Sequence, residues 1–221
     1  HERNNIQSEI RNDALQLWHD EALQAEVAQL KAGFLSQPQA LLHGDVHTGS
    51  IFINDDNCKL IDAEFGFYGP IGFDVGSLIG NLLLNYLGHF GLTQDTEARQ
   101  RHQDYLLSQV QTLWQEFEKQ FKQLMSNECR EPTLQNSVYQ QRFIQQVFAD
   151  ALGYAGCELI RRTVGLAHVA DLDSISDGTL RGQSERKALK LGRELILQRF
   201  ELANMAQVLQ LLHYQTDNPQ D

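Results

Sequence analysis

The stretch LLHGDVHTGSIFINDDNCKLIDAEFGFYGPIGFD, residues 41–74, determines how the whole chain is interpreted. It opens with a short apolar run that leads into His-Gly-Asp at residues 43–45, and Ser50 lies five positions beyond that aspartate. A second apolar run leads into the acidic triplet Asp-Ala-Glu at residues 62–64. Acidic side chains therefore stand just after each of two apolar runs, Asp45 three positions beyond the first and Asp62 directly after the second.

The composition sets limits on the kind of protein. Hydrophobic residues make up 42% and charged residues 21% of the 221 positions, which is typical of a soluble globular protein. No apolar run reaches the roughly 18 residues that suggest a membrane span, so we expect no membrane partner. The formal net charge of −11 argues against nucleic-acid binding. The N-terminal residues contain no apolar core of a signal peptide, so we expect a cytoplasmic protein. They also contain no initiator Met, so we expect a shortened chain.

Hydrophobic periodicity predicts a mainly α-helical chain with a small β-hairpin insert. We expect Gly33 to end the first helix and Gly165 to end the fourth. Two short strands around a turn at 55–57 form the expected hairpin, and a Gly-rich connector follows it. The expected helices cover residues 8–32, 75 to at least 84, 97–126, 138–164 and 183–213, the strands cover 51–54 and 58–61, and the connector covers 65–73.

The acidic residues suit phosphoryl transfer. A catalytic loop over residues 43–50, a hairpin over 51–61 and an Asp-x-Glu motif at 62–64 follow the order of the catalytic loop, hairpin and magnesium motif of protein kinases. Asp45 would then be the catalytic base that orients the attacking hydroxyl. In an extended segment, Asp62 and Glu64 would share one side and hold Mg²⁺. Ser50 occupies the place of a magnesium-binding Asn and would be a weaker ligand.

The two histidines of the loop allow a second interpretation. His43, Asp45 and His47 alternate, so on a strand they could share one zinc or iron ion in a metal-dependent hydrolase. Gly44 and Gly49 disfavour a strand at this position. We therefore favour His43 as a residue that packs the loop and His47 as a local hydrogen-bonding group.

Two further positions have both a structural and a functional interpretation. Asp74 can cap the helix that begins near Val75, and it can also hold the backbone of the catalytic loop. Arg161 and Arg162 can stabilise a helix C-terminus, or they can bind sugar hydroxyls and the transferring phosphoryl group. Adjacent helical positions lie about 100° apart, so the two side chains share a target only if the helix ends there, as Gly165 suggests.

The departures from protein kinases indicate a kinase for a small molecule. Gly44 replaces the Arg that reads a phosphorylated activation loop in many protein kinases, and the segment 62–74 is too short for a regulated loop. No Gly-rich nucleotide loop and no strand with a phosphate-binding Lys precede residue 41. We therefore expect residues 1–221 to form the C-terminal lobe of a protein-kinase-like α+β fold, with the N-terminal nucleotide lobe outside this chain.

The motifs HGDVHTGSIF, IDAEFGFYGPIGFDVGSLIGNLLLNY and RRTVGLAHVADL resemble the C-terminal lobe of the methylthioribose kinases. Choline kinases and aminoglycoside phosphotransferases share the His-Gly-Asp triplet and the later Asp. The resemblance implies ATP- and Mg²⁺-dependent phosphorylation of the 1-hydroxyl of 5-methylthioribose in methionine salvage, by a homodimer. It implies that Asp45 is the base and that Arg161 and Arg162 contact the substrate. It also implies that the 62–64 motif, including Ala63, faces the metal and the nucleotide. Another alcohol, such as choline or an aminoglycoside, is the alternative acceptor.

Overall fold

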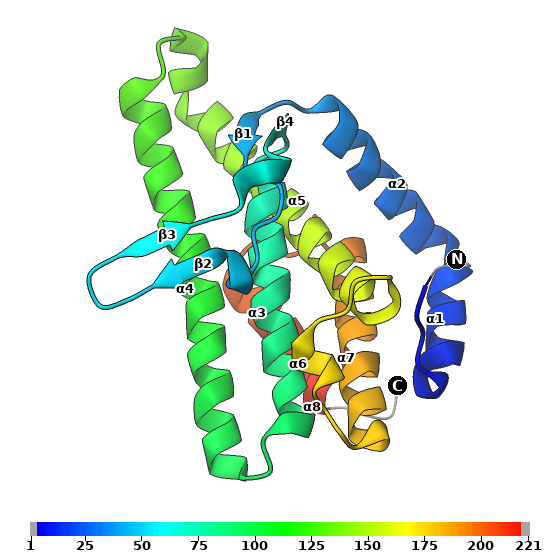
Figure 1. Cartoon of the computed structure of the whole chain (residues 1–221). Coiled ribbons are helices and arrows are strands. Elements are labelled where there is room, and N and C mark those ends of the chain that lie inside the picture. Colours follow the sequence, from blue (N-terminus) through cyan, green and yellow to red (C-terminus); the bar gives the residue numbers. More distant parts are fainter. Residues whose placement is uncertain (1–3, 218–221) are drawn as a thin grey trace.

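A computed structural model describes residues 4–217, and it is mainly helical (Figure 1). No helix in this range combines the length and the apolar character that crossing a membrane requires. The helices are α1 (Arg11–Trp18), α2 (Glu21–Ser36), α3 (Gly72–Leu92), α4 (Thr96–Glu128), α5 (Ser137–Val164), α6 (Ala170–Asp173), α7 (Gly178–Leu197) and α8 (Met205–Asp217). The strands are β1 (Ala40–Leu42), β2 (Ile51–Ile53), β3 (Cys58–Leu60) and β4 (Phe67–Gly69).

The core is formed by α3, α5 and α7, with α4 packed along the outer side of α3 (Figure 1). Leucine and isoleucine recur on α3 at a helical period, which gives that helix an apolar face. Because α5 contacts both α3 and α7, it is the central helix of the domain. Buried core residues include Ile79, Leu83 and Leu87 of α3, Leu152 and Leu159 of α5, and Leu191 and Leu195 of α7.

Two antiparallel pairs of strands accompany the helices. The β2–β3 hairpin pairs Ile51 with Leu60 and Ile53 with Cys58, as the sequence predicts. Its turn is stabilised by Asn54, whose side-chain oxygen accepts hydrogen bonds from the backbone N–H groups of Asp56 and Asn57 at 3.0 and 2.7 Å. The hairpin extends away from the helical body beside α4 (Figure 1). The expected mainly helical fold with a small hairpin is confirmed.

The second pair of strands was not predicted. Within the segment expected to be a connector, β4 pairs with β1, so that Leu42 lies opposite Phe67 and Ala40 opposite Gly69. Gly66 and Gly69 suggested a loop, yet a strand of three residues needs little intrinsic propensity when a partner strand is available. This pairing brings the start of the catalytic loop next to the end of the Asp-x-Glu segment.

Two helix predictions are wrong in their boundaries. The predicted helix 8–32 is broken after Trp18, and Asp20 caps a new helix by accepting the N–H of Leu23 at 2.9 Å. Gly33 does not end this helix, because α2 continues to Ser36. The predicted helix 183–213 is two helices, α7 and α8, and α7 begins five residues earlier at Gly178. The predictions for 97–126 and 138–164 are confirmed as α4 and α5.

The close approach of α3 and α5 depends on Gly76. A Cβ atom at this position would overlap the carbonyl oxygen of Ala151 and lie 2.9 Å from the Cβ of Tyr154. Since backbone atoms of α5 cannot move aside as a flexible side chain can, a methyl group here would push the two helices apart. The glycine is therefore required by space rather than by backbone conformation.

We expect Gly76→Ala to lower the free energy of unfolding by about 1–3 kcal/mol, because it overpacks the α3–α5 contact. Gly33→Ala is the matched control. A Cβ at Gly33 would meet only the side chain of Gln37, at 3.5 Å or more, so the gain in helix propensity should raise stability by about 0.5–1 kcal/mol. Denaturant unfolding of both variants measures the two shifts, and a shift of the same sign in both would contradict this packing argument.

Candidate active site

The catalytic loop is fixed to the first turn of α3 by Asp74. Its Oδ2 accepts the backbone N–H of His43 at 2.7 Å, and its Oδ1 accepts that of Gly44 at 3.1 Å. The predicted role in holding the loop backbone is confirmed. The predicted role as a helix cap is wrong, since α3 begins at Gly72 and Asp74 lies inside its first turn.

Gly44 allows the loop to turn at this point. Its φ angle is +87°, in a region that residues with a side chain rarely adopt. A Cβ would also overlap the carbonyl oxygen of Phe65, in the turn that follows the Asp-x-Glu motif. The absence of the protein-kinase Arg at this position therefore has a local structural reason as well.

Both histidines hydrogen-bond within the loop and its neighbours. His43 Nε2 lies 2.7 Å from the carbonyl oxygen of Ile61, so Nε2 carries the proton, and Nδ1 accepts the N–H of Asp45 at 3.4 Å. His47 Nδ1 accepts the N–H of Gly49 at 3.0 Å. These bonds match the expected packing and hydrogen-bonding roles. In residues 4–217, no group of three or more His, Cys, Asp or Glu side chains is placed to hold a metal, so the structure gives the hydrolase interpretation no support.

Asp45 projects from this loop into a cavity of about 260 Å³. Its side chain is 41% exposed, and Oδ2 lies 3.8 Å from Nε2 of His47. Residues from the loop, α3 and α5 line the cavity: Gly44, Asp45, Val46, Phe73, Ser77, Tyr154, Cys157, Glu158 and Arg161. The structure thus brings together the predicted base and one of the two predicted substrate arginines, whereas Arg162 does not line the cavity.

Burial affects two titratable groups on the α5 wall of the cavity. Desolvation raises the pKa of the Cys157 thiol to about 11, and it also raises the pKa of the Tyr154 hydroxyl above its usual range. Tyr154 donates a hydrogen bond to the carbonyl oxygen of Leu30 at 3.0 Å. Both groups are therefore neutral at physiological pH, and the acidic and basic side chains that line the cavity are Asp45, Glu158 and Arg161.

The two arginines share one protein partner that the sequence analysis did not identify. Glu158 accepts hydrogen bonds from Arg161 through Oε2 and from Arg162 through Oε1, each with a shortest distance of 2.7 Å. The sequence contained a usable indication, because residues three and four positions apart face each other on a helix. The helix does end at Gly165, as predicted, but the shared target is a buried carboxylate.

The Asp-x-Glu segment is not extended, contrary to the prediction. Asp62 has a φ angle of 63°, the left-handed conformation that Asp tolerates better than most residues, and residues 63–65 form a 3-10 turn. Asp62, Ala63 and Glu64 are all exposed at the base of the hairpin. Their assignment to nucleotide and metal stays a prediction.

Ser50, the remaining predicted nucleotide contact, is buried within the loop. Its hydroxyl accepts the N–H of His47 at 3.0 Å and donates to the carbonyl oxygen of His47 at 2.8 Å. These bonds order the turn that leads into β2. A contact between Ser50 and a nucleotide or metal stays a prediction.

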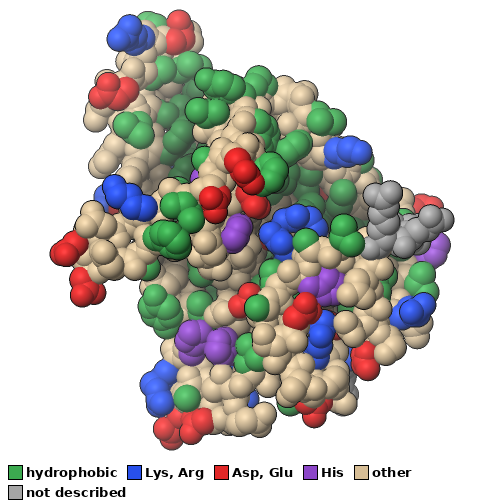
Figure 2. All heavy atoms as spheres, viewed as in Figure 1, with side chains coloured by type: hydrophobic (Ala, Val, Ile, Leu, Met, Phe, Trp, Pro, Cys, Tyr) green, Lys and Arg blue, Asp and Glu red, His purple; other side chains and the backbone are tan. Residues whose placement is uncertain are grey.

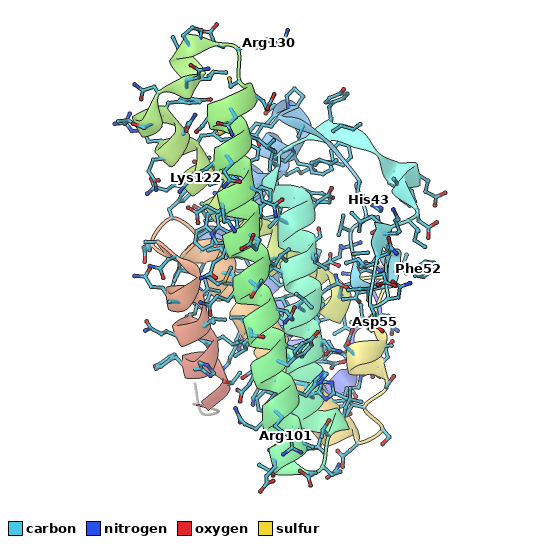
Figure 3. All side chains as sticks on the ribbon, turned by 90° about the vertical axis from the view of Figure 1, so that its left-hand side faces the viewer. His43, Phe52, Asp55, Arg101, Lys122 and Arg130 are labelled. Carbon is cyan, nitrogen blue, oxygen red and sulfur yellow. The ribbon has the colours of Figure 1, made fainter. Side chains whose placement is uncertain are left out.

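The figures show how these groups are distributed over the surface. In Figure 2, acidic, histidine and basic side chains gather near the centre of one face, below the β1–β4 pair of Figure 1. Figure 3 shows His43 near the base of the hairpin, with Phe52 and Asp55 further along it, beside α4. The candidate site thus lies where the loop, the hairpin and the helical body meet.

Comparisons with known proteins show what the sequence is similar to. A sequence profile of the phosphotransferase enzyme family (APH) matches residues 2–119. The chain is 52% identical over 212 residues to methylthioribose kinase of Pectobacterium carotovorum subsp. carotovorum (strain PC1), which covers 95% of this chain and 52% of that protein. It is 53% identical over 197 residues to methylthioribose kinase of Yersinia pestis (strain Pestoides F), which covers 89% of this chain and 48% of that protein.

The resemblance to methylthioribose kinases expected from the motifs is therefore confirmed. The chain spans about half the length of the curated relatives it matches. The family profile includes the loop with Asp45 and the Asp-x-Glu motif, and it ends before Arg161.

We expect Asp74→Asn to lower the free energy of unfolding by about 1–3 kcal/mol, since one of the two loop N–H groups would lose its acceptor. Asp177→Asn is the matched control. Asp177 caps α7 with a single oxygen that accepts two N–H groups, and Asn caps helices about as well as Asp, so its cost should stay below about 1 kcal/mol. Thermal and denaturant unfolding provide the comparison, and equal losses would refute the role given to Asp74.

Proposed function

The chain belongs to the phosphotransferase enzyme family, and from this membership we propose that the protein transfers the γ-phosphoryl group of ATP to the 1-hydroxyl of 5-methylthioribose. The observation that carries the proposal is the shared cavity of Asp45 and Arg161, which lie far apart in the sequence. Identity above 50% to methylthioribose kinases, over 89% or more of this chain, supports the choice of acceptor. The reaction would serve methionine salvage.

Asp45 is the proposed base. A carboxylate in this role orients the sugar hydroxyl and accepts its proton as the bond to phosphorus forms. Its partial exposure leaves the carboxylate accessible to a substrate, while the loop bonds to Asp74 and His43 keep its backbone in place. The neutral Tyr154 and Cys157 of the opposite wall cannot take over this role at physiological pH.

Arg161 and Arg162 are the proposed substrate contacts. A guanidinium group can donate to several sugar hydroxyls, and it stabilises negative charge on a transferring phosphoryl group. With Glu158 paired to both arginines, the local sum is one positive charge. Asp45 lines the same cavity and balances this formal charge, which suits a neutral, hydroxyl-bearing acceptor.

Asp62 and Glu64 would hold Mg²⁺, with Ala63 and Ser50 nearer the nucleotide. Magnesium usually takes only one or two protein carboxylates together with phosphate oxygens and water, so two exposed carboxylates fit its requirements. The ion would neutralise charge on the phosphates of ATP. The positive φ angle of Asp62 turns this short segment at the base of the hairpin and leaves both acids accessible.

The resemblance to methylthioribose kinases also supports a homodimer in the cytoplasm, and we include both in the proposal. The measured solution mass of the protein would test the dimer directly. The acidic net charge of −11 is in keeping with a small-molecule acceptor rather than a nucleic-acid partner.

We expect Asp45→Asn to reduce kcat by about 10²–10⁴-fold, because an amide cannot accept the hydroxyl proton. ADP release from Mg-ATP is measured with methylthioribose, choline and an aminoglycoside side by side, and the wild type should turn over methylthioribose alone. Asp104→Asn, a change at an exposed position of α4, should retain full activity. Turnover of a different alcohol by the wild type would refute the proposed substrate. Normal turnover by the Asp45→Asn variant would refute the proposed base.

A further inference from the structure

Glu158 is a buried acid on the wall of the candidate cavity. Its side chain is only 6% exposed, whereas that of Arg161 is 54% exposed. Burying a carboxylate is costly unless its oxygens are paired and hydrogen-bonded. The buried carboxylate of Glu158 therefore needs compensating hydrogen bonds, and the partners that provide them indicate its role.

Among the described residues 4–217, each hydrogen-bond partner of Glu158 is a nitrogen donor, and two of the three partner residues are the proposed substrate contacts. Oε2 accepts both Nε and Nη2 of Arg161, at 3.0 and 2.7 Å. Oε1 accepts Nε of Arg162 at 2.7 Å and Nδ2 of Asn81 at 3.2 Å. Each carboxylate oxygen thus has two donors, and each arginine is held by Nε, the atom nearest its flexible stem.

These bonds restrict the arginines without using all their donors. Within residues 4–217, Nη1 of Arg161 and both Nη atoms of Arg162 have no hydrogen bond to the protein. A guanidinium group fixed at one edge presents its other edge in a defined direction, so less side-chain freedom is lost when a ligand binds. The Arg161 side chain that is fixed in this way lines the cavity that contains Asp45.

Helix α3 is shaped to accommodate this carboxylate. A Cβ at Gly80 would lie 2.9 Å from Cβ and 3.1 Å from Cγ of Glu158, so the glycine provides the space for the acid. On the next position, Asn81 donates to Oε1 and also to the carbonyl oxygen of Ser77 at 3.1 Å. Two consecutive residues of α3 therefore fix Glu158 from the side opposite its own helix.

We propose that Glu158 is a positioning residue for the phosphoryl acceptor, whose buried carboxylate fixes Arg161 and Arg162 in the orientation that binds the sugar opposite Asp45. This inference rests on the proposed function for its substrate. It extends that function, because it assigns the geometry of the arginine pair to a residue that does not itself accept the proton or the phosphoryl group.

The first test is the steady-state kinetics of Glu158→Gln in the intact protein. The substitution keeps the shape of the side chain but removes its charge, and it turns one acceptor into a donor that faces a guanidinium group. We expect KM for methylthioribose to rise about tenfold or more, while KM for ATP stays within about twofold. Partial unfolding would lower the amount of active enzyme and would leave both KM values unchanged.

Glu185→Gln is the matched control. Glu185 is also a buried acid that pairs with an arginine four positions away on the same helix, since its Oε1 accepts Nε of Arg181 at 2.8 Å, but it does not line the cavity. This variant should lose stability without a change in KM for either substrate. A comparable rise of KM for methylthioribose in the control would overturn the proposal.

A second measurement does not depend on turnover. Modification of arginine side chains by phenylglyoxal, followed residue by residue by mass spectrometry, reports how firmly Arg161 and Arg162 are held. We expect Glu158→Gln to accelerate modification of both several-fold and to leave Arg186, which pairs with Asp13, unchanged. If the wild type fails to phosphorylate methylthioribose, the proposed function fails. Unchanged modification of Arg161 and Arg162 in the variant overturns the role of Glu158 in either case.

Discussion

The structure of the candidate site depends on the pair of hydrogen bonds from the Asp74 carboxylate to the N–H groups of His43 and Gly44. They connect the catalytic loop to the first turn of a long, buried helix. Because α3 is packed tightly against α5, the loop is held in a fixed position relative to the residues of α5, which lie about a hundred positions later in the sequence. The Asp74 side chain thus connects the backbone beside Asp45 to the packed helical core.

The packing of α3 on α5 determines which residues can meet across the cavity. Gly76 lets the backbones approach, and one turn further along α3, Gly80 leaves room for the side chain of Glu158. Had the helices been separated by larger side chains, Asn81 could not have reached the Glu158 carboxylate. Stability and site geometry therefore depend on the same stripe of small residues, since the contact that closes the core also holds the acid that pairs with Arg161 and Arg162.

Much of the fold and of the site was predictable, for identifiable reasons. The β2–β3 hairpin follows from two short apolar runs around a polar turn. Asp45 was predictable because the order of the His-Gly-Asp triplet, the hairpin and the Asp-x-Glu motif matches that of kinases. The turn at Asp62 was not predictable, because a left-handed residue other than glycine depends on tertiary contacts rather than on local preference. Glu158 was not predicted, because the two arginines were weighed only against the end of the helix, although its spacing of three and four residues to Arg161 and Arg162 is visible in the sequence.

The acids of the site occupy contrasting environments, and the contrast assigns them different physical tasks. Glu158 is buried and fully engaged by donors, so it can hold other groups in place but has little capacity left for a ligand. Asp62 and Glu64 are exposed, and within residues 4–217 neither carboxylate makes a hydrogen bond or ion pair, so the oxygens of both are free for the proposed Mg²⁺. Asp45 lies between these extremes, with its backbone fixed and its carboxylate accessible. In the proposed reaction the protein itself preorganises the sugar side of the site, whereas the carboxylates of the nucleotide side would gain their partners only when Mg²⁺ and ATP bind.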